Sequence, residues 1–372
     1  MIEQTLPSDL TELAEVQAQY EEELLNRPNV VGVAIGNKIT EKKGDTGEAA
    51  VTVLVESKVH EDLLSDDDIV PATISGVKTD VQEVGIVQAG GPTAVYPELS
   101  YSELDIDVKP NGLGTAIAAP PAIAAPPVTR PRIEEQVGAL ALALRARPAM
   151  GGYSVGHFRI TAGTIATGCY DWGSFPDVPA RYYLLSNNHV LANSNAAAIG
   201  DPILQPGPFD GGTIPADVIG RLSRFVPIRF IPPVPPVPLN LVDAAIAEVQ
   251  FHDLNREVYW IGHVKTLYLK PKVGDLVQKT GRTTSFTTGR VTNINATIDV
   301  NYGAGRVARF VRQILAQTAT GRAMGAGGDS GSLVTSLDEE GVGLLFAGSP
   351  VITVINHLSF VQSLLRVRIT EK

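Results

Sequence analysis

The sequence predicts a mainly β protein preceded by a small α+β domain. Its 372 residues include 36 Gly and 26 Pro, a composition typical of many short strands joined by tight turns. Val, Ile and Thr are abundant throughout the chain, and these residues favour strands. A chain of this length can bury a large core and divide into two or three domains.

Residues 1–110 are predicted to form an acidic α+β domain, for which a regulatory role is one option. Apolar side chains recur at spacings of three and four over residues 9–26, which predicts a helix. A second helix is expected over residues 61–69, before Pro71. The other expected elements are strands over residues 30–36, 49–55 and 77–87. The glycine-rich run 85–91 lacks the Lys of a phosphate-binding loop and predicts turns.

Residues 111–149 are predicted to be a Pro/Ala-rich linker with a helix over residues 132–147. The repeated Ala and Pro of residues 116–127 fit neither a stable helix nor a central strand. The proline run 231–238 predicts a rigid surface loop, although an SH3-like partner also binds such runs.

Residues 325–334 contain a candidate nucleophile, since they read Gly-Ala-Gly-Gly-Asp-Ser-Gly-Ser-Leu-Val. Glycines on both sides of Ser330 permit a tight turn, and backbone N–H groups on such a turn can stabilise an oxyanion. We assign Ser330 as the nucleophile and the N–H groups of Gly328 and Ser330 as the oxyanion hole. The alternative is a Gly/Ser-rich turn without chemistry. The G-x-S-x-G pattern occurs at neither Ser330 nor Ser332.

A base and an orienting carboxylate precede this segment. His189 follows an apolar run and a polar turn, and imidazole exchanges protons near neutral pH. Asp243 lies within an apolar run, where a carboxylate requires a partner such as an imidazole N–H. The alternatives are a histidine packed in a core and an aspartate that caps a strand end. The order His…Asp…Ser is one of the known orders of the serine triad.

These segments resemble those of chymotrypsin-like (trypsin-family) serine proteases, in which Gly-Asp-Ser-Gly carries the nucleophile. Asn-Asn-His-Val, residues 187–190, is similar to the bacterial form, and Gly-Arg-Thr-Thr, residues 281–284, resembles the hairpin that opens the second barrel. The finer likeness is to bacterial trypsin-like proteins and their plant relatives of the narrow-leaf type. The resemblance implies a double six-stranded β-barrel of the chymotrypsin type, with barrels over residues 150–255 and 256–372 and a C-terminal helix.

The resemblance also implies where substrate binds. Met324, six residues before the serine, is expected at the base of the specificity pocket, and Ala347 and Gly348 are expected along the substrate backbone. Because no acid stands at position 324, the expected preference is for an apolar P1 residue. His157 is expected to be structural.

Activation is a separate question. In trypsin-type zymogens a new Ile-Val-Gly-Gly terminus pairs with the Asp before the serine, and no such sequence lies near residue 150. Asp329 therefore needs another partner, and the site is either preformed or gated by residues 1–110. That segment carries 22 acidic and 7 basic side chains, against 18 and 23 in residues 111–372. The asymmetry suggests intramolecular docking; simple solubility is the alternative.

The function that follows is a serine endopeptidase acting on proteins or peptides through an acyl-enzyme. The alternatives are a non-catalytic binding or scaffolding protein on the same fold, and a hydrolase of small esters. We expect no metal, no cofactor and no nucleic-acid partner, because ligand clusters and basic motifs are absent from the sequence. Assembly of the chain into a homo-oligomer is one further option.

The location is expected to be cytoplasmic. Cys169 is the only cysteine, so no intramolecular disulfide forms, and no histidine beside it activates the thiol. The N-terminal residues lack the pattern of a signal peptide, and no apolar run reaches the length of a membrane-spanning helix.

Overall fold

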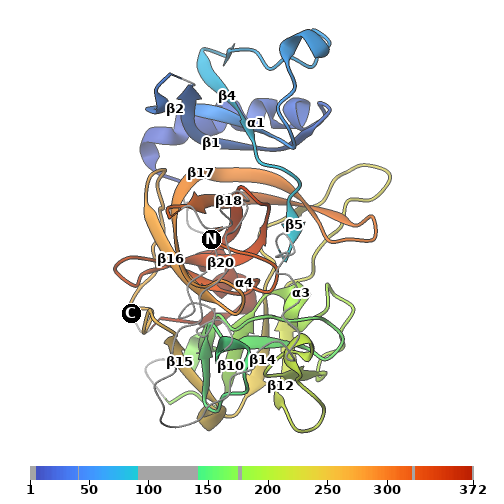
Figure 1. Cartoon of the computed structure of the whole chain (residues 1–372), viewed down its shortest axis with the longest axis vertical. Helices are drawn as coiled ribbons and strands as arrows, with labels where there is room; N and C mark the ends of the chain where they lie inside the picture. The colour runs from blue at the N-terminus through green and yellow to red at the C-terminus, as the bar shows by residue number, and fades with distance from the viewer. Residues whose placement is uncertain (1–5, 41, 91–140, 175–177, 321–322, 371–372) are drawn as a thin grey trace, which may run out of the picture.

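The computed structural model describes residues 6–40, 42–90, 141–174, 178–320 and 323–370. An N-terminal unit lies above one β-barrel, and a second β-barrel lies below that one in Figure 1. The predicted helix over residues 132–147 and the alanine–proline repeats fall largely or wholly outside the described residues.

The N-terminal unit consists of one helix packed on a small sheet. Its elements are α1 (Thr11–Leu25), β1 (Val30–Thr40), β2 (Gly44–Val55), β3 (Thr73–Ile74) and β4 (Val77–Glu83). The helix expected over residues 9–26 is therefore confirmed, as are the first two strands. The helix expected over residues 61–69 was wrong, because only a 3-10 turn, Glu61–Leu63, forms there with no buried residue. Without an apolar face, and with three adjacent acids following, this segment has nothing to hold it as a helix.

The second barrel is a closed ring of six antiparallel strands. They are β16 (Leu276–Gly281), β17 (Ser285–Asn301), β18 (Val307–Thr318), β19 (Leu333–Ser336), β20 (Gly341–Gly348) and β21 (Thr353–His357). The pairing runs β16–β17–β18–β21–β20–β19 and returns to β16. Each strand of the ring thus pairs with a neighbour on both sides over at least part of its length.

The first barrel is a curled sheet of eight strands in the order β22-β9-β10-β14-β12-β11-β7-β8. Their bounds are β7 (Ser154–His157), β8 (Gly163–Thr164), β9 (Thr167–Asp171), β10 (Tyr182–Ser186), β11 (Pro202–Leu204), β12 (Val218–Phe225), β14 (Ala245–Val249) and β22 (Val367–Arg368). Two further short strands, β6 (Ala149–Gly151) and β15 (Leu254–Val258), pair in parallel beside it.

The C-terminal helix joins the two barrels. Helix α4 (Leu358–Leu365) follows β21 of the second barrel, and β22 then pairs with β9 of the first. One apolar cluster contains side chains from both barrels and from this helix, among them Tyr183, Leu344 and Phe360. The predicted fold class, a mainly β body with two barrels and a closing helix after an α+β segment, is confirmed.

The N-terminal unit extends the second barrel's sheet. Strand β1 pairs antiparallel with β17, with Gly32 opposite Ile298. Gln17 of α1 is buried, and its amide donates to the Asn295 carbonyl oxygen at 2.9 Å while the Asn295 amide donates back at 3.0 Å. The unit is thus attached by backbone pairing and by a buried side-chain contact.

The glycine-rich run expected to form turns contains a short strand, which corrects that prediction. Strand β4 ends at Glu83, and β5 (Gln88–Ala89) pairs with both β17 and β20. Residues Ala347 and Gly348 of β20 pair with β21 on one side only within the barrel. Their other edge therefore offers unpaired backbone groups, and β5 fills it.

Cys169 and His157 both lie inside the first barrel. Cys169 is buried, and burial raises the pKa of its thiol to about 12, which leaves it unreactive. His157 is also buried, and its Nε2 contacts Asp201 Oδ2 at 3.1 Å.

None of the described helices has the length and apolar character needed to cross a membrane.

Candidate active site

Three segments distant in sequence bring the predicted triad residues to the contact between the barrels. His189 lies in the one-turn helix α3 (Asn188–Leu191), directly after β10, and Asp243 lies just before β14. Ser330 lies in the turn before β19 of the second barrel. The base and the carboxylate thus come from one barrel and the serine from the other.

His189 and Asp243 form a tight pair. His189 Nδ1 lies 2.7 Å from Asp243 Oδ2, and the His189 backbone N–H donates to Asp243 Oδ1 at 3.1 Å. The Asp243 side chain is fully buried. Its backbone is also fixed, because its N–H donates to Asn356 Oδ1 at 2.9 Å and its carbonyl accepts from Asn187 Nδ2 at 2.7 Å. The carboxylate therefore orients the imidazole with the Nε2 atom pointing away from it.

A tyrosine that the sequence did not identify completes the partners of Asp243. The Tyr302 hydroxyl donates to Asp243 Oδ2 at 2.7 Å. Burial, together with the nearby Asp243 charge, raises the pKa of Tyr302 well above its usual value, so the hydroxyl stays a donor. Tyr302 follows β17 of the second barrel, and no local motif marks it in the sequence. It ties the carboxylate of one barrel to a hairpin of the other.

Ser330 makes no hydrogen bond to this pair. Its Oγ donates to the Phe346 carbonyl oxygen at 3.5 Å, at the outer limit of a hydrogen bond. The His189 Nε2 atom is buried and has no hydrogen-bond partner among the described residues. A buried polar atom without a partner is costly and is common at reactive sites. The serine–histidine hydrogen bond is therefore not formed in this structure.

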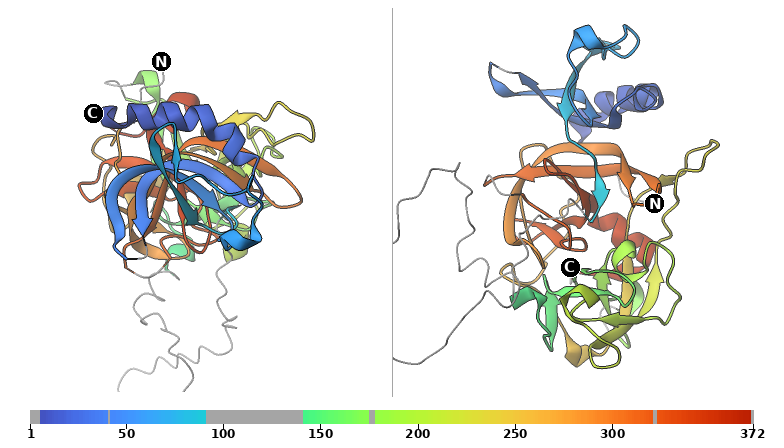
Figure 2. Two further views of the ribbon diagram at one scale, coloured as in Figure 1. Left: turned by 90° about the horizontal axis from the view of Figure 1, so that it is seen from above. Right: turned by 45° about the vertical axis from the view of Figure 1, so that its right-hand side comes forward.

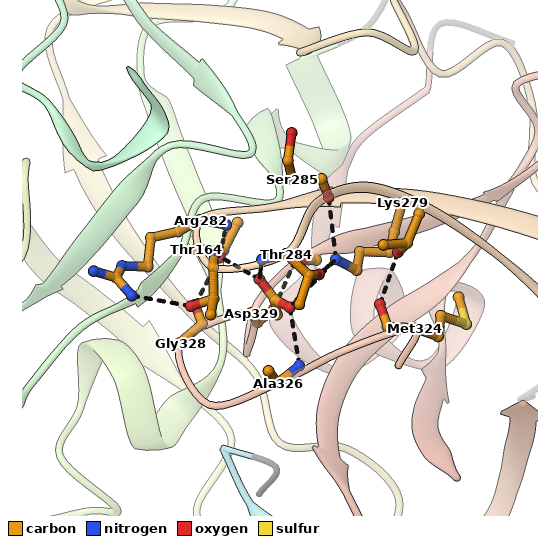
Figure 3. Close-up of polar contacts among 12 residues, drawn as sticks. Thr164, Lys279, Arg282, Thr284, Ser285, Met324, Ala326, Gly328 and Asp329 are labelled. Carbon is orange, nitrogen blue, oxygen red and sulfur yellow. Dashed lines mark hydrogen bonds and ion pairs between the residues drawn. The ribbon is translucent and has the colours of Figure 1, made fainter. Parts of the chain in front are cut away.

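Thr164 of the first barrel fixes the turn around Ser330 through two hydrogen bonds. Thr164 donates its hydroxyl to the Gly328 carbonyl at 2.8 Å (Figure 3) and its N–H to the Ser330 carbonyl at 2.7 Å. Gly331 has φ +95°, and a Cβ there would overlap Ser186 Oγ and the Thr164 carbonyl oxygen. The N–H groups of Gly328 and Ser330 donate to no other group in the described part of the chain. Both predicted oxyanion-hole donors are thus left available.

Asp329, next to the serine, has a buried cation as its partner. Lys279 Nζ lies 3.3 Å from Asp329 Oδ2, and neither side chain is exposed (Figure 3). The carboxylate also accepts hydrogen bonds from the N–H groups of Thr283, Thr284 and Ala326 at 2.8–3.1 Å, and from the Thr284 hydroxyl at 2.6 Å. Burial lowers the pKa of Lys279 below its usual value, and the Asp329 charge opposes this shift only in part.

This arrangement explains the Gly-Arg-Thr-Thr motif. Gly281 leaves room for Asp329, because a Cβ there would overlap the carboxylate. The two threonines supply the donors described above, and Arg282 pairs with Asp210 of the first barrel through both its Nε and its Nη2. The sequence showed that Asp329 needs a partner but did not identify Lys279. The available signal was the alternation of the strand, which places Lys279 on the same face as the apolar Val277.

The residues expected to bind substrate fall in two places. Met324 is 2% exposed and packs in the apolar core of the second barrel, with its sulfur filling the space beside Gly289. Ala347 and Gly348 lie in β20 and pair with β5. The structure therefore separates Met324, which is sealed in the core, from the two residues at the strand edge.

Comparisons with known proteins give distant structural likenesses. Neither a family model nor a curated protein sequence matches the chain. Protease A of Thermobifida fusca is 13% identical, with 59% of this chain and 96% of that chain covered at a TM-score of 0.39. A glutamic acid-specific serine protease is 18% identical (59% and 98%, TM-score 0.40), and a Nocardiopsis protease is 15% identical (59% and 97%, TM-score 0.37). These neighbours are chymotrypsin-like bacterial serine proteases. Because these sequence identities and TM-scores are low, we assign the fold from the strand order of the two barrels.

Replacing Lys279 tests the buried ion pair. We expect Lys279→Met to lower the free energy of unfolding by about 3–5 kcal/mol, because the Asp329 carboxylate is left buried without its cation. The double variant Lys279→Met/Asp329→Asn should recover part of the loss, since both charges are then gone. Urea unfolding measures both effects, with Lys272→Met, an exposed lysine, as the matched control. A loss no larger than the control's would contradict a structural role for the pair.

Proposed function

We propose that this chain is a serine endopeptidase that acts through Ser330, His189 and Asp243. The observation that carries the proposal is the His189–Asp243 pair, 2.7 Å apart and held by contacts from both barrels, together with a serine turn that has two backbone N–H groups without acceptors among the described residues. A protein with no catalytic role has no need of this combination. The fold alone would not support the proposal, because one fold serves many functions.

The proposed reaction proceeds in two halves. Ser330 Oγ turns from the Phe346 carbonyl toward His189 Nε2, gives up its proton and attacks the carbonyl carbon of the scissile bond. The N–H groups of Gly328 and Ser330 bind the developing oxyanion. His189 then protonates the leaving amine, which breaks the C–N bond and leaves an acyl-enzyme. Water, deprotonated by His189, attacks the acyl carbon; the bond from that carbon to Ser330 Oγ breaks, His189 returns the proton to Oγ, and the carboxylic acid product leaves.

The proposed substrate is an extended peptide, since the edge of β20 at residues 346–348 offers backbone groups to a pairing strand. The preference for an apolar P1 residue remains part of the proposal, as does action in the cytoplasm.

A second reading is a binding or scaffolding protein whose site stays closed. It is supported by the unpartnered His189 Nε2 and by the occupation of the β20 edge by β5. The two readings differ in whether Ser330 can be made reactive.

Labelling with a fluorophosphonate probe separates these readings. We expect the purified protein to become labelled at Ser330, because the probe requires an activated serine and an open oxyanion site. Labelling should vanish in Ser330→Ala and persist in Ser363→Ala, a matched change at an exposed serine of α4. Labelling that survives in Ser330→Ala would reject Ser330 as the nucleophile.

Tyr302→Phe tests how Asp243 is held. The ring contacts of Tyr302 with Phe230 and Phe310 remain, while the hydrogen bond to a charged acceptor, typically about 1.5–3 kcal/mol, is lost. We expect kcat to fall by about 10- to 100-fold with KM nearly unchanged, because the hydroxyl acts through Asp243. Tyr268→Phe removes a similar bond to Asp275, 2.7 Å long and outside the site, and should leave kcat unaltered. Equal effects of the two changes would assign Tyr302 a merely structural role.

Cleavage of a peptide library tests the P1 preference. We expect apolar residues to dominate at P1, because the resemblance gives position 324 to the pocket base and no acid stands there; Met324 itself is buried in the barrel core. Mass spectrometry of the products identifies the P1 residue at each cut. Predominance of basic residues there would reject the preference while leaving the triad in place.

A further inference from the structure

The chain places a strand of its own on the proposed substrate-binding edge. Strand β5 pairs antiparallel with β20, with Ala89 opposite Ala347 and Gln88 opposite Gly348. The Gly90 N–H then donates to the Phe346 carbonyl oxygen at 3.1 Å. An extended peptide bound by strand addition makes the same kinds of backbone contact. These residues therefore occupy the place expected for a substrate strand.

Gly90 brings this strand up to the serine. Its acceptor, the Phe346 carbonyl oxygen, also receives the Ser330 hydroxyl. A Cβ built on Gly90 would lie 4.0 Å from Ser330 Oγ. Gly90 has φ +86°, so the chain leaves the extended path at this point, as glycine permits. The segment thus reaches the nucleophile and turns there.

The segment is anchored on both sides. Val84 and Val87 are 1% and 2% exposed and pack in the apolar cluster that contains Phe346. The Asn301 N–H, at the end of β17, donates to the Val87 carbonyl at 2.9 Å, and the Ser349 hydroxyl donates to the Val84 carbonyl. Figures 1 and 2 show this segment running from the N-terminal unit along the second barrel toward α3.

The contact is made by backbone and apolar groups. Residues 84–90 read Val-Gly-Ile-Val-Gln-Ala-Gly and carry no charged side chain. The acidic balance of residues 1–110 therefore does not act at the cleft through this segment. An interaction of this kind is expected to be insensitive to salt, unlike one between exposed charges.

We propose that residues 88–90 are a built-in competitor that occupies the substrate strand's place and slows access to Ser330. The proposal rests on the proposed function and specifies its regulation. The β20 edge accepts one strand at a time, and a tethered segment competes at an effective concentration of about millimolar. Substrate is then an extended peptide that displaces β5, and release of the N-terminal segment raises activity.

Gly90→Pro tests the competition in the full chain. Proline removes the N–H that binds the Phe346 carbonyl and cannot adopt φ +86°. We expect fluorophosphonate labelling of Ser330 to become about tenfold faster, which corresponds to the loss of one hydrogen bond. Gly76→Pro is the matched control, because Gly76 has φ +83°, lies between β3 and β4, and touches nothing in the cleft.

A disulfide across the pair makes the same test reversible. Ala89 and Ala347 are directly opposite each other, so Ala89→Cys/Ala347→Cys brings two thiols within bonding reach. The oxidised double variant should label more slowly than its own reduced form. Ala347→Cys alone should show no such redox dependence, since Cys169 is buried.

The outcomes separate the two proposals. Faster labelling in Gly90→Pro but not in Gly76→Pro, with slowing by the disulfide, supports the competitor. Equal labelling rates in wild type, Gly90→Pro and both redox forms would overturn it while leaving the peptidase intact. Absence of labelling in every form, including the reduced and Gly90→Pro proteins, would overturn the peptidase itself.

Discussion

The buried pair of Lys279 and Asp329 is the constraint on which the active-site geometry depends. Asp329 precedes the serine, so whatever holds its carboxylate also sets the backbone from Gly328 to Gly331. Lys279 and the donors of the Gly-Arg-Thr-Thr segment hold it without any new chain terminus. Buried ion pairs add little net stability because desolvation opposes the attraction. We infer that this pair instead favours one conformation of the turn that carries the two proposed oxyanion donors.

The proposed catalytic groups come from both barrels, and polar contacts across the boundary between the barrels fix their relative positions. Thr164 of the first barrel holds the serine turn of the second. In the opposite sense, Tyr302 and Asn356 of the second barrel hold Asp243 of the first. Because these buried groups have partners from the other barrel, a relative shift of the barrels would leave several of them unpaired. The site is therefore a property of the assembled pair of barrels.

The N-terminal unit links this site to the rest of the chain. It joins the second barrel through β1 and β17 and sends β5 to the cleft. The sequence pointed to docking through its acidic balance, but the contacts at the cleft are those of a strand edge and two buried valines. Charge counts describe a whole segment, whereas recognition of the cleft depends on which backbone groups meet there.

The sequence by itself determined the elements whose signals are local. Amphipathic periodicity predicted α1, and short motifs singled out His189, Asp243 and Ser330 as the proposed triad, because each proposed role requires a residue type in a particular local context. It did not determine Tyr302 or Lys279, and it misjudged residues 61–69 and 85–91. Tertiary structure decided these because their partners lie far away in sequence: Asp243 is 59 residues from Tyr302, and Asp329 is 50 from Lys279. A buried polar group or an open strand edge is satisfied only when folding brings its partner to it.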